Sequence, residues 1–389
     1  MSFTRKTTPL LSSSSLGSLA RDVSLPADAQ DTISSVSWSP VANHLAAASW
    51  DGKVRVYDVG NPNNNNNGIA ARGVALLAAD GPLLDCDWAK DGSMVAAAGA
   101  DRKTHILHLA TGQQAALGAH DAPVRSVRFV EVPGTGAPVV ASGSWDKTVR
   151  YWDLRQREAV GAVACRERVY GMDAKARLLV VATADRYFHL VDLRNPTVIA
   201  RTAESSLRHQ TKAIAAFPDG TGWATASIEG RCGINAVDEA EASKINFTFR
   251  CHRDLPDARQ TAKVWGVNDV QFHPVNHAVF ATAGSDGTFH FWDRVAHSRL
   301  RGYPPVGSNS SSGSGSGSGS NSNSMSDGIS GGVSGATAIT STAFNRDGTL
   351  FAYAAGYDWS MGFAKNSPAL ETRLVLHPVT AEDATPRRK

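Results

Sequence analysis

The sequence is short of cysteine and of apolar runs, and each shortage excludes a class of protein. Its four cysteines stand singly, without a Cys-x-x-Cys pair, so they indicate neither a disulfide framework nor a zinc site. A reducing compartment fits this usage best. No apolar run approaches membrane-spanning length, and residues 10–16 are too polar for the core of a signal peptide. The sequence therefore predicts no cofactor and no membrane insertion.

A large excess of charge is also lacking. The formal net charge is only +3, so attraction of the whole molecule to nucleic acid should be weak, and any basic surface must be local. The chain does contain 42% hydrophobic residues, spread over many short β-branched and aromatic segments between turns that contain Gly and Asp. This pattern predicts an all-β protein with a large core.

One such segment, residues 143–154, reads Gly-Ser-Trp-Asp-Lys-Thr-Val-Arg-Tyr-Trp-Asp-Leu and predicts a tight turn followed by a strand. Upstream, Ala-His-Asp at 119–121 precedes another predicted strand. A start that resembles Gly-His, followed by an end in Trp-Asp, is the signature of a WD-repeat propeller blade. In such a blade we expect a relay of hydrogen bonds among His120, Ser142 or Ser144, Asp146 and Trp152.

A serine, a histidine and an aspartate could also form the triad of a hydrolase. We favour the relay because no Gly-x-Ser-x-Gly elbow is present and the repeat already accounts for these residues. The sequence also contains no metal-ligand spacing such as His-Glu-x-x-His and no phosphate-binding loop. We therefore expect a protein that is not an enzyme.

The unit recurs along the chain at a period of roughly forty residues, which is the period of WD repeats. Each copy has an acid in its tight turn: Asp51, Asp101, Asp146, Asp185, Glu229, Asp286 and Asp358. Seven copies predict a single seven-bladed WD-repeat propeller over residues 21–389, since each blade can bury its faces only against its neighbours. Residues 22–26 predict a short strand that completes the last blade and joins the two ends of the chain.

Three segments fall outside the repeats. Residues 1–20 are rich in Ser and Thr and lack periodicity, which predicts a disordered leader. The Asn-rich stretch 61–68 predicts a flexible loop. Residues 307–335 are almost wholly Ser, Gly and Asn, so they predict a flexible insertion between the sixth and seventh blades.

Two further segments resemble known proteins more specifically. Residues 227–231 (Ser-Ile-Glu-Gly-Arg) and 246–253 (Asn-Phe-Thr-Phe-Arg-Cys-His-Arg) closely resemble a part shared by two families of seven-bladed WD proteins. One family comprises messenger-RNA export factors that dock on a GLFG-repeat nucleoporin. The other comprises mitotic-checkpoint proteins that dock on checkpoint kinases. Both families bind a short peptide segment called GLEBS.

The sequence Tyr-Asp-Trp-Ser at 357–360 resembles the export factors and is lacking in the checkpoint family. The resemblance implies a non-enzymatic adaptor of the nucleus, at the nuclear pore complex and nuclear envelope, that shuttles to the cytoplasm. Its implied partners are the GLEBS motif of the GLFG-repeat nucleoporin and single-stranded RNA or messenger ribonucleoprotein. The alternative is a mitotic-checkpoint adaptor with checkpoint-kinase or spindle partners.

The resemblance also implies which residues bind. Arg231 matches an arginine that faces acidic residues of GLEBS, a role that suits a planar guanidinium, although its spacing alone would fit a solvated turn residue. Four residues match a groove on the propeller edge that is used for RNA or partners: Phe249, Trp292, Arg294 and Arg299. Aromatic faces beside positive charge suit single-stranded RNA. Trp292 also occupies the structural Trp position of its repeat, so a core role stays open for it.

Overall fold

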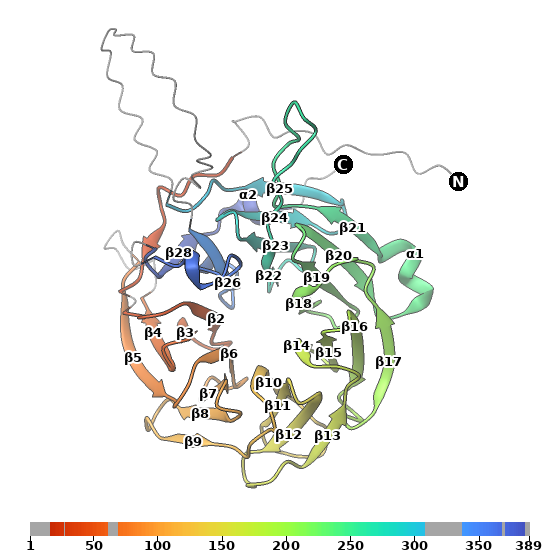
Figure 1. Cartoon of the computed structure of the whole chain (residues 1–389). Coiled ribbons are helices and arrows are strands. Elements are labelled where there is room, and N and C mark those ends of the chain that lie inside the picture. Colours follow the sequence, from red (N-terminus) through yellow and green to blue (C-terminus); the bar gives the residue numbers. More distant parts are fainter. Residues whose placement is uncertain (1–15, 27, 61–68, 308–336, 368–369, 386–389) are drawn as a thin grey trace.

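The computed structural model describes residues 16–26, 28–60, 69–307, 337–367 and 370–385. The predicted loop at 61–68 and, apart from Gly307, the predicted insertion at 307–335 lie outside these ranges. The described strands form seven four-stranded antiparallel sheets that follow one another around a ring (Figure 1). The prediction of an all-β, seven-bladed propeller is confirmed.

Each of the first six blades is built from four consecutive strands, in order from the centre of the ring outward. Blades one to three contain β2 (Ile33–Trp38), β3 (His44–Ser49), β4 (Lys53–Val59) and β5 (Ala71–Ala78); β6 (Leu83–Trp88), β7 (Met94–Gly99), β8 (Thr104–His108) and β9 (Gln114–Ala116); and β10 (Val124–Val130), β11 (Val139–Ser144), β12 (Thr148–Asp153) and β13 (Gly161–Ala164). Blades four to six contain β14 (Val169–Lys175), β15 (Leu178–Thr183), β16 (Tyr187–Asp192) and β17 (Ile199–Glu204); β18 (Thr211–Ala216), β19 (Gly222–Ser227), β20 (Arg231–Ala236) and β21 (Phe247–Arg250); and β22 (Val267–Phe272), β23 (Val279–Gly284), β24 (Phe289–Asp293) and β25 (Ser298–Gly302).

The helical segments are short and lie outside the sheets. Two are α1 (Ala242–Ile245) and α2 (Ala381–Ala384), and two are single 3₁₀ turns at Glu239–Glu241 and Phe363–Lys365. Within the described ranges, no helix has the length and apolar character needed to cross a bilayer.

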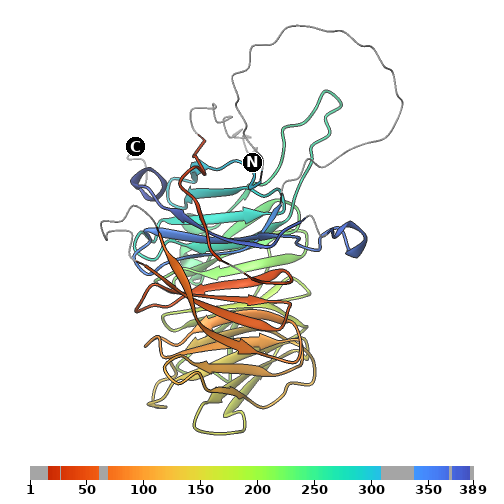
Figure 2. The same ribbon diagram turned by 90° about the vertical axis from the view of Figure 1, so that its left-hand side faces the viewer.

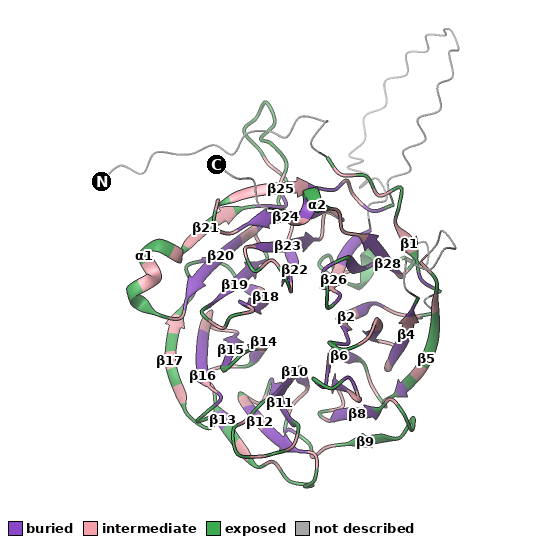
Figure 3. Ribbon diagram, turned by 180° about the vertical axis from the view of Figure 1, so that it is seen from behind, coloured by how far each residue is buried: buried purple, intermediate pink, exposed green. Residues whose placement is uncertain are grey.

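Burial follows the position of a strand within its blade, as Figure 3 shows. The second strands β11 and β15 are buried at every residue, because both of their faces pack against neighbouring blades. The outermost strand β17 instead alternates between half-buried and exposed residues, since only its inward face meets the protein. The core is therefore a set of layers between blades.

Polar side chains join neighbouring blades around the centre. In five blades the residue after a bulge in the innermost strand is Ser or Asp, and its oxygen accepts a backbone N–H from the next blade. These acceptors are Ser35, Asp85, Ser126, Asp269 and Ser341, bound by the N–H groups of Cys86, Val127, Met172, Thr342 and Val36 respectively. Blades four and five have Gly171 and Ala213 at this position, which offer no side-chain acceptor.

The seventh blade combines both ends of the chain. It contains β26 (Ala338–Phe344), β27 (Leu350–Gly356), β28 (Arg373–Pro378) and, as its outermost strand, β1 (Val23–Ser24). The side chain of Asp22 accepts hydrogen bonds from the Tyr353 hydroxyl at 2.6 Å and from His377 Nδ1 at 2.6 Å. The predicted closing strand therefore exists, and a buried carboxylate anchors it to the strands beside it.

The last residues of the predicted leader lie against blade six. Residues 1–15 lie outside the described ranges, but Leu16 forms a parallel bridge with Gly302, and Gly17 N donates to Gly302 O at 2.8 Å. A Cβ at position 17 would lie 2.2 Å from the Tyr303 ring, so only glycine permits this approach. In the side view of Figure 2, this segment runs along the sheets.

Candidate functional site

The four residues of the expected relay meet inside blade three. His120 Nδ1 donates to Asp146 at 2.8 Å, Ser142 Oγ lies 2.7 Å from His120 Nε2, and Trp152 Nε1 donates to Ser142 Oγ at 2.7 Å. Burial lowers the pKa of His120 despite the neighbouring carboxylate, so the neutral ring can accept the Ser142 proton. The side chains of Ser142 and His120 are buried, which leaves no approach for a hydrolase substrate.

Replacing the acid of this relay should destabilise the fold in a pH-dependent way. Burial alone would raise the pKa of Asp146, but hydrogen bonds from Thr148, the Asp121 N–H and His120 outweigh it and lower the pKa. A depressed acid contributes stability above its unfolded pKa and loses it as the pH falls through the folded pKa. We expect Asp146→Asn to cost about 1–2 kcal/mol at pH 7 in urea unfolding, with the difference shrinking below about pH 4.

Asp121→Asn is the matched control for this measurement. The Asp121 side chain is 88% exposed and pairs only with Arg150 on the surface, so its loss should change stability by less than about 0.5 kcal/mol. Equal effects of the two substitutions, or a constant difference from pH 7 to pH 3, would show that Asp146 does not act through a depressed pKa.

A second relay lies in blade six and includes a residue assigned to the groove. His252 Nδ1 donates to Asp286 at 2.9 Å, its Nε2 lies 3.0 Å from Thr282 Oγ1, and Trp292 Nε1 donates to the same oxygen at 3.0 Å. Trp292 is only 7% exposed. The repeat pattern could have identified His252 as the relay histidine of blade six. In the sequence, however, the hairpin at 253–264 separates His252 from the strands of that blade.

The aromatic residues assigned to the groove meet where blade five joins blade six. The ring of Phe249 lies 4.7 Å from that of Trp292, and the Arg299 guanidinium lies 5.9 Å from the Trp292 ring. Beside them, Phe247 stacks on the exposed His297 at a centroid distance of 3.9 Å. The structure thus brings together Phe249, Trp292 and Arg299, and adds Phe247, which the sequence reading did not single out as a groove residue.

Arg294 does not join this group. Its Nε donates to His277 O at 2.8 Å, and its guanidinium lies 4.4 Å from the centre of the Phe217 ring. A further carboxylate contact, to Asp219 at 3.9 Å, holds it on the loops between blades. Only one of the two arginines assigned to the groove therefore lies beside its aromatic rings.

Arg231 belongs to a cluster of cations at the tight turn of blade five. Arg231 lies opposite Arg250 in the pairing of β20 with β21, and Arg253 follows three residues later. We call these three residues the blade-five basic cluster. Arg231 Nε lies 3.4 Å from Glu229, which His209 also approaches to 3.4 Å. The Glu229 carboxylate thus lies beside both Arg231 and His209.

Among the described residues, Arg253 contributes a buried donor without a partner to the blade-five basic cluster. It donates one hydrogen bond, from Nη2 to Glu229 O at 3.1 Å, while its buried Nε has no hydrogen-bond partner in the described structure. Burial lowers the pKa of Arg253, and repulsion from Arg250 and Arg231 lowers it further. A carboxylate from a partner would relieve the repulsion among these guanidinium groups.

Comparison with known proteins agrees with this architecture. Residues 23–58, 112–153 and 246–293 match the family model described as WD domain, G-beta repeat. The chain is 46% identical to the WD40 repeat protein poxJ of Penicillium oxalicum, over 95% of this chain and 97% of that protein. It is 42% identical to the mRNA export factor GLE2 of Chaetomium thermophilum, over 98% and 97% of the two chains. It is also 42% identical to the Poly(A)+ RNA export protein of Schizosaccharomyces pombe, over 97% and 96%.

The chain belongs to the WD-repeat messenger-RNA export factor family. Proteins of the checkpoint type are also similar to it, since it is 34% identical to Mitotic checkpoint protein BUB3.1 of Arabidopsis thaliana over 90% of this chain. Overall identity alone therefore does not separate this chain sharply from proteins of the checkpoint type.

The segment at 357–360 that resembles the export factors joins three blades in this family member. Asp358 accepts hydrogen bonds from Ser285 and from Asn268 Nδ2 in blade six. On the other side, the indole of Trp359 stacks on Trp50 at 5.4 Å and donates to Thr32 Oγ1 at 3.0 Å. The segment therefore connects blade seven to blades six and one.

Proposed function

We propose that this protein is a non-enzymatic messenger-RNA export factor that docks on the GLEBS segment of a GLFG-repeat nucleoporin at the nuclear pore complex. The names of its relatives support a role in RNA export. The observation that carries the docking proposal is the blade-five basic cluster, in which Arg231 and Arg250 repel Arg253 beside the Glu229 carboxylate. The proposed role consists of binding, with no chemical step.

Docking would use the geometry of this cluster. An extended peptide would lie across the face of the propeller on which the tight turns emerge, with main-chain and apolar contacts supplying most of the area. Carboxylates of the peptide would pair with Arg231 and Arg253, because a guanidinium binds a carboxylate through two parallel hydrogen bonds. Calorimetry with a synthetic GLEBS peptide tests the proposal directly, and no binding at micromolar concentration would contradict it.

The groove between blades five and six would add affinity for single-stranded RNA. Stacking on Phe247 and Phe249 would tolerate any base, and Arg299 would contact a phosphate. His297 stands where the groove of the family usually has an arginine, so its contribution to phosphate binding at neutral pH should be small. Nuclear localisation with shuttling to the cytoplasm follows from such a role.

Two arginines of the predicted groove provide a matched test of RNA binding. We expect Arg299→Gln to weaken binding of a labelled single-stranded RNA by about fivefold and to reduce the salt slope by about one, because one phosphate contact is lost. Arg294→Gln should leave the affinity unchanged, since that guanidinium packs on Phe217. Fluorescence anisotropy at several salt concentrations measures both. Equal losses for the two variants would mean that RNA responds to overall charge and not to the groove.

The alternative, a checkpoint adaptor, is favoured only by similarity to BUB3.1. The same calorimetry separates the two functions if GLEBS peptides from a nucleoporin and from a checkpoint kinase are compared. Tighter binding of the kinase peptide would reverse our preference.

A further inference from the structure

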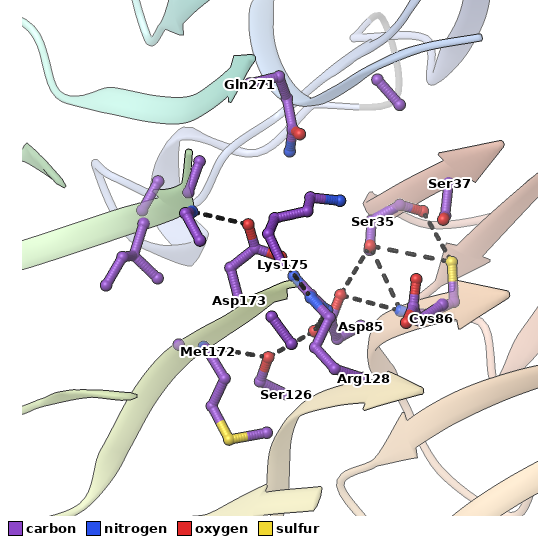
Figure 4. A pocket seen from close by; sticks show the side chains of 18 of the residues that line it. Ser35, Ser37, Asp85, Cys86, Ser126, Arg128, Met172, Asp173, Lys175 and Gln271 are labelled. Carbon is purple, nitrogen blue, oxygen red and sulfur yellow. Dashed lines mark hydrogen bonds and ion pairs between the residues drawn. The ribbon is translucent and has the colours of Figure 1, made fainter. Parts of the chain in front are cut away.

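The innermost strands enclose a polar cavity of about 620 Å³ along the axis of the propeller. Figure 4 shows its middle, where the side chains of Ser35, Asp85, Ser126 and Arg128 point toward one another. Arg128 contacts Asp85 at 2.7 Å and Asp173 at 3.1 Å, so its charge is matched by carboxylates. Cationic side chains nearer one end of the cavity have fewer carboxylates beside them.

Three donors occupy equivalent positions at one end of this cavity. Arg125, Tyr170 and Lys212 are each the second residue of an innermost strand, in the successive blades three, four and five, and all three line the cavity. We call this set the channel mouth. Val124 pairs with Ser144, and Thr211 pairs with Ser227, so the channel mouth opens on the face where the tight turns emerge.

These donors have few partners. Arg125 donates one hydrogen bond, to Leu84 O at 3.2 Å, and no carboxylate of the described residues lies within 4 Å of its guanidinium. Lys212 approaches one carboxylate, that of Asp358 at 3.8 Å, which already accepts hydrogen bonds from Ser285 and Asn268. The Tyr170 hydroxyl has no hydrogen bond to a described residue. A guanidinium has five N–H donors, so most of the capacity of Arg125 is unused.

The wall beneath two of these three donors lacks the polar side chains that the other blades provide there. At the bulge position, where five blades have Ser or Asp, blades four and five have Gly171 and Ala213. Burial lowers the pKa of Lys212, although the charge of Asp358 opposes this effect, so the site disfavours an isolated ammonium group. A bound anion would restore the balance.

The channel mouth also adjoins the blade-five basic cluster. Gly266 lies between the two. A Cβ added at Gly266 would lie 3.6 Å from Lys212 Nζ and 3.7 Å from Ile228 Cα. Ile228 begins the tight turn that leads to Arg231. Lys212 therefore lies close to the tight turn of blade five that leads to Arg231.

We infer that the channel mouth is a second anion-binding site, which holds one carboxylate or phosphate group through Arg125, Lys212 and the Tyr170 hydroxyl. Two sources fit this chemistry. One is an acidic side chain of the peptide that docks on the blade-five basic cluster, which rests on the proposed function. The other is a small free anion that enters the cavity independently of any peptide.

Binding to the intact protein tests the inference with one probe for each source. Inorganic pyrophosphate represents the free anion, and a synthetic GLEBS peptide represents the side chain; both are titrated calorimetrically at low ionic strength. We expect Arg125→Gln and Lys212→Gln each to weaken at least one probe by about tenfold, because a charge-assisted hydrogen bond is lost. Arg125→Lys, which keeps the charge, should restore most of the affinity.

Lys90→Gln is the matched control, since Lys90 also lines the cavity but pairs with Glu131 at 2.7 Å and lies beyond β6, at the opposite end. Thermal melts identify variants that lose affinity by unfolding.

A loss of affinity confined to pyrophosphate supports a free anion as the ligand, and a loss confined to the peptide supports an acidic side chain. If folded Arg125→Gln and Lys212→Gln bind both probes as the wild type does, the site is overturned. Failure of the peptide to bind wild-type protein would contradict the proposed function alone, while pyrophosphate still decides the site.

Discussion

Arg231→Glu is expected to weaken binding of a GLEBS peptide by about a hundredfold or more while leaving the propeller folded. The substitution replaces attraction by repulsion at an interface from which water is excluded, where such a change is typically worth several kcal/mol. Because Arg231 is partly exposed at a turn, the free energy of unfolding should change by about 0.5 kcal/mol or less.

Lys103→Glu is the matched control for this prediction. Lys103 stands two residues after the turn acid Asp101 in blade two, just as Arg231 stands two residues after Glu229, and it approaches only the exposed Asp80 at 3.9 Å. Its reversal should change peptide affinity by less than about threefold. If both reversals weaken the peptide equally, overall charge governs docking. If Arg231→Glu binds normally and melts normally, Arg231 is a solvated turn residue.

Asp22→Ala should lower the free energy of unfolding by about 3 kcal/mol. The Asp22 carboxylate is buried and accepts hydrogen bonds from Tyr353 and His377, both of which are also buried. Removing it leaves two buried donors without an acceptor and loosens the strand that closes the ring. Urea unfolding followed by circular dichroism measures the loss.

Asp28→Ala controls for the removal of an acid from the same segment. The Asp28 side chain is 82% exposed and pairs with Arg55, which also contacts Asp51, so its loss should cost less than about 1 kcal/mol. A wild-type unfolding midpoint for Asp22→Ala would show that the closing strand contributes little to stability.

The fold could be predicted because its determinants are local and repeated. His120, Asp146 and Trp152 are spaced as the WD repeat requires, and the structure joins them through Ser142. The closing strand could be predicted because a propeller needs its last blade completed. Both inferences rest on the repeat itself, and neither requires knowing where a binding partner contacts the propeller.

The site was predictable only in part, because it depends on where side chains point. Arg294 and Arg299 are close in sequence, but Arg294 lies in the turn after β24, whereas Arg299 lies in β25, opposite Trp292. Arg294 stays on the turn and packs elsewhere. The indole nitrogen of Trp292 belongs to a relay and its ring contacts Phe249, while its role in a binding groove stays a prediction.

The residues that sequence reading missed owe their character to their surroundings. Nothing in the sequence shows that Arg253 has an unsatisfied nitrogen, because this property results from the burial of its Nε in the folded chain. The channel mouth has the same origin. The sequence around Arg125 and Lys212 does not mark them as binding residues. They lie together only because the innermost strands of the blades converge on one axis.

The seam between β1 and β28 also has a consequence for biosynthesis. His377 follows its partner Asp22 by 355 residues. At translation rates of 5–20 residues per second, about 20 to 70 s pass between the synthesis of the two residues. During that interval the ring stays open, and the first blade presents a face that only the seventh can cover. The ring of a nascent chain therefore cannot close until its final strand, β28, has been synthesised.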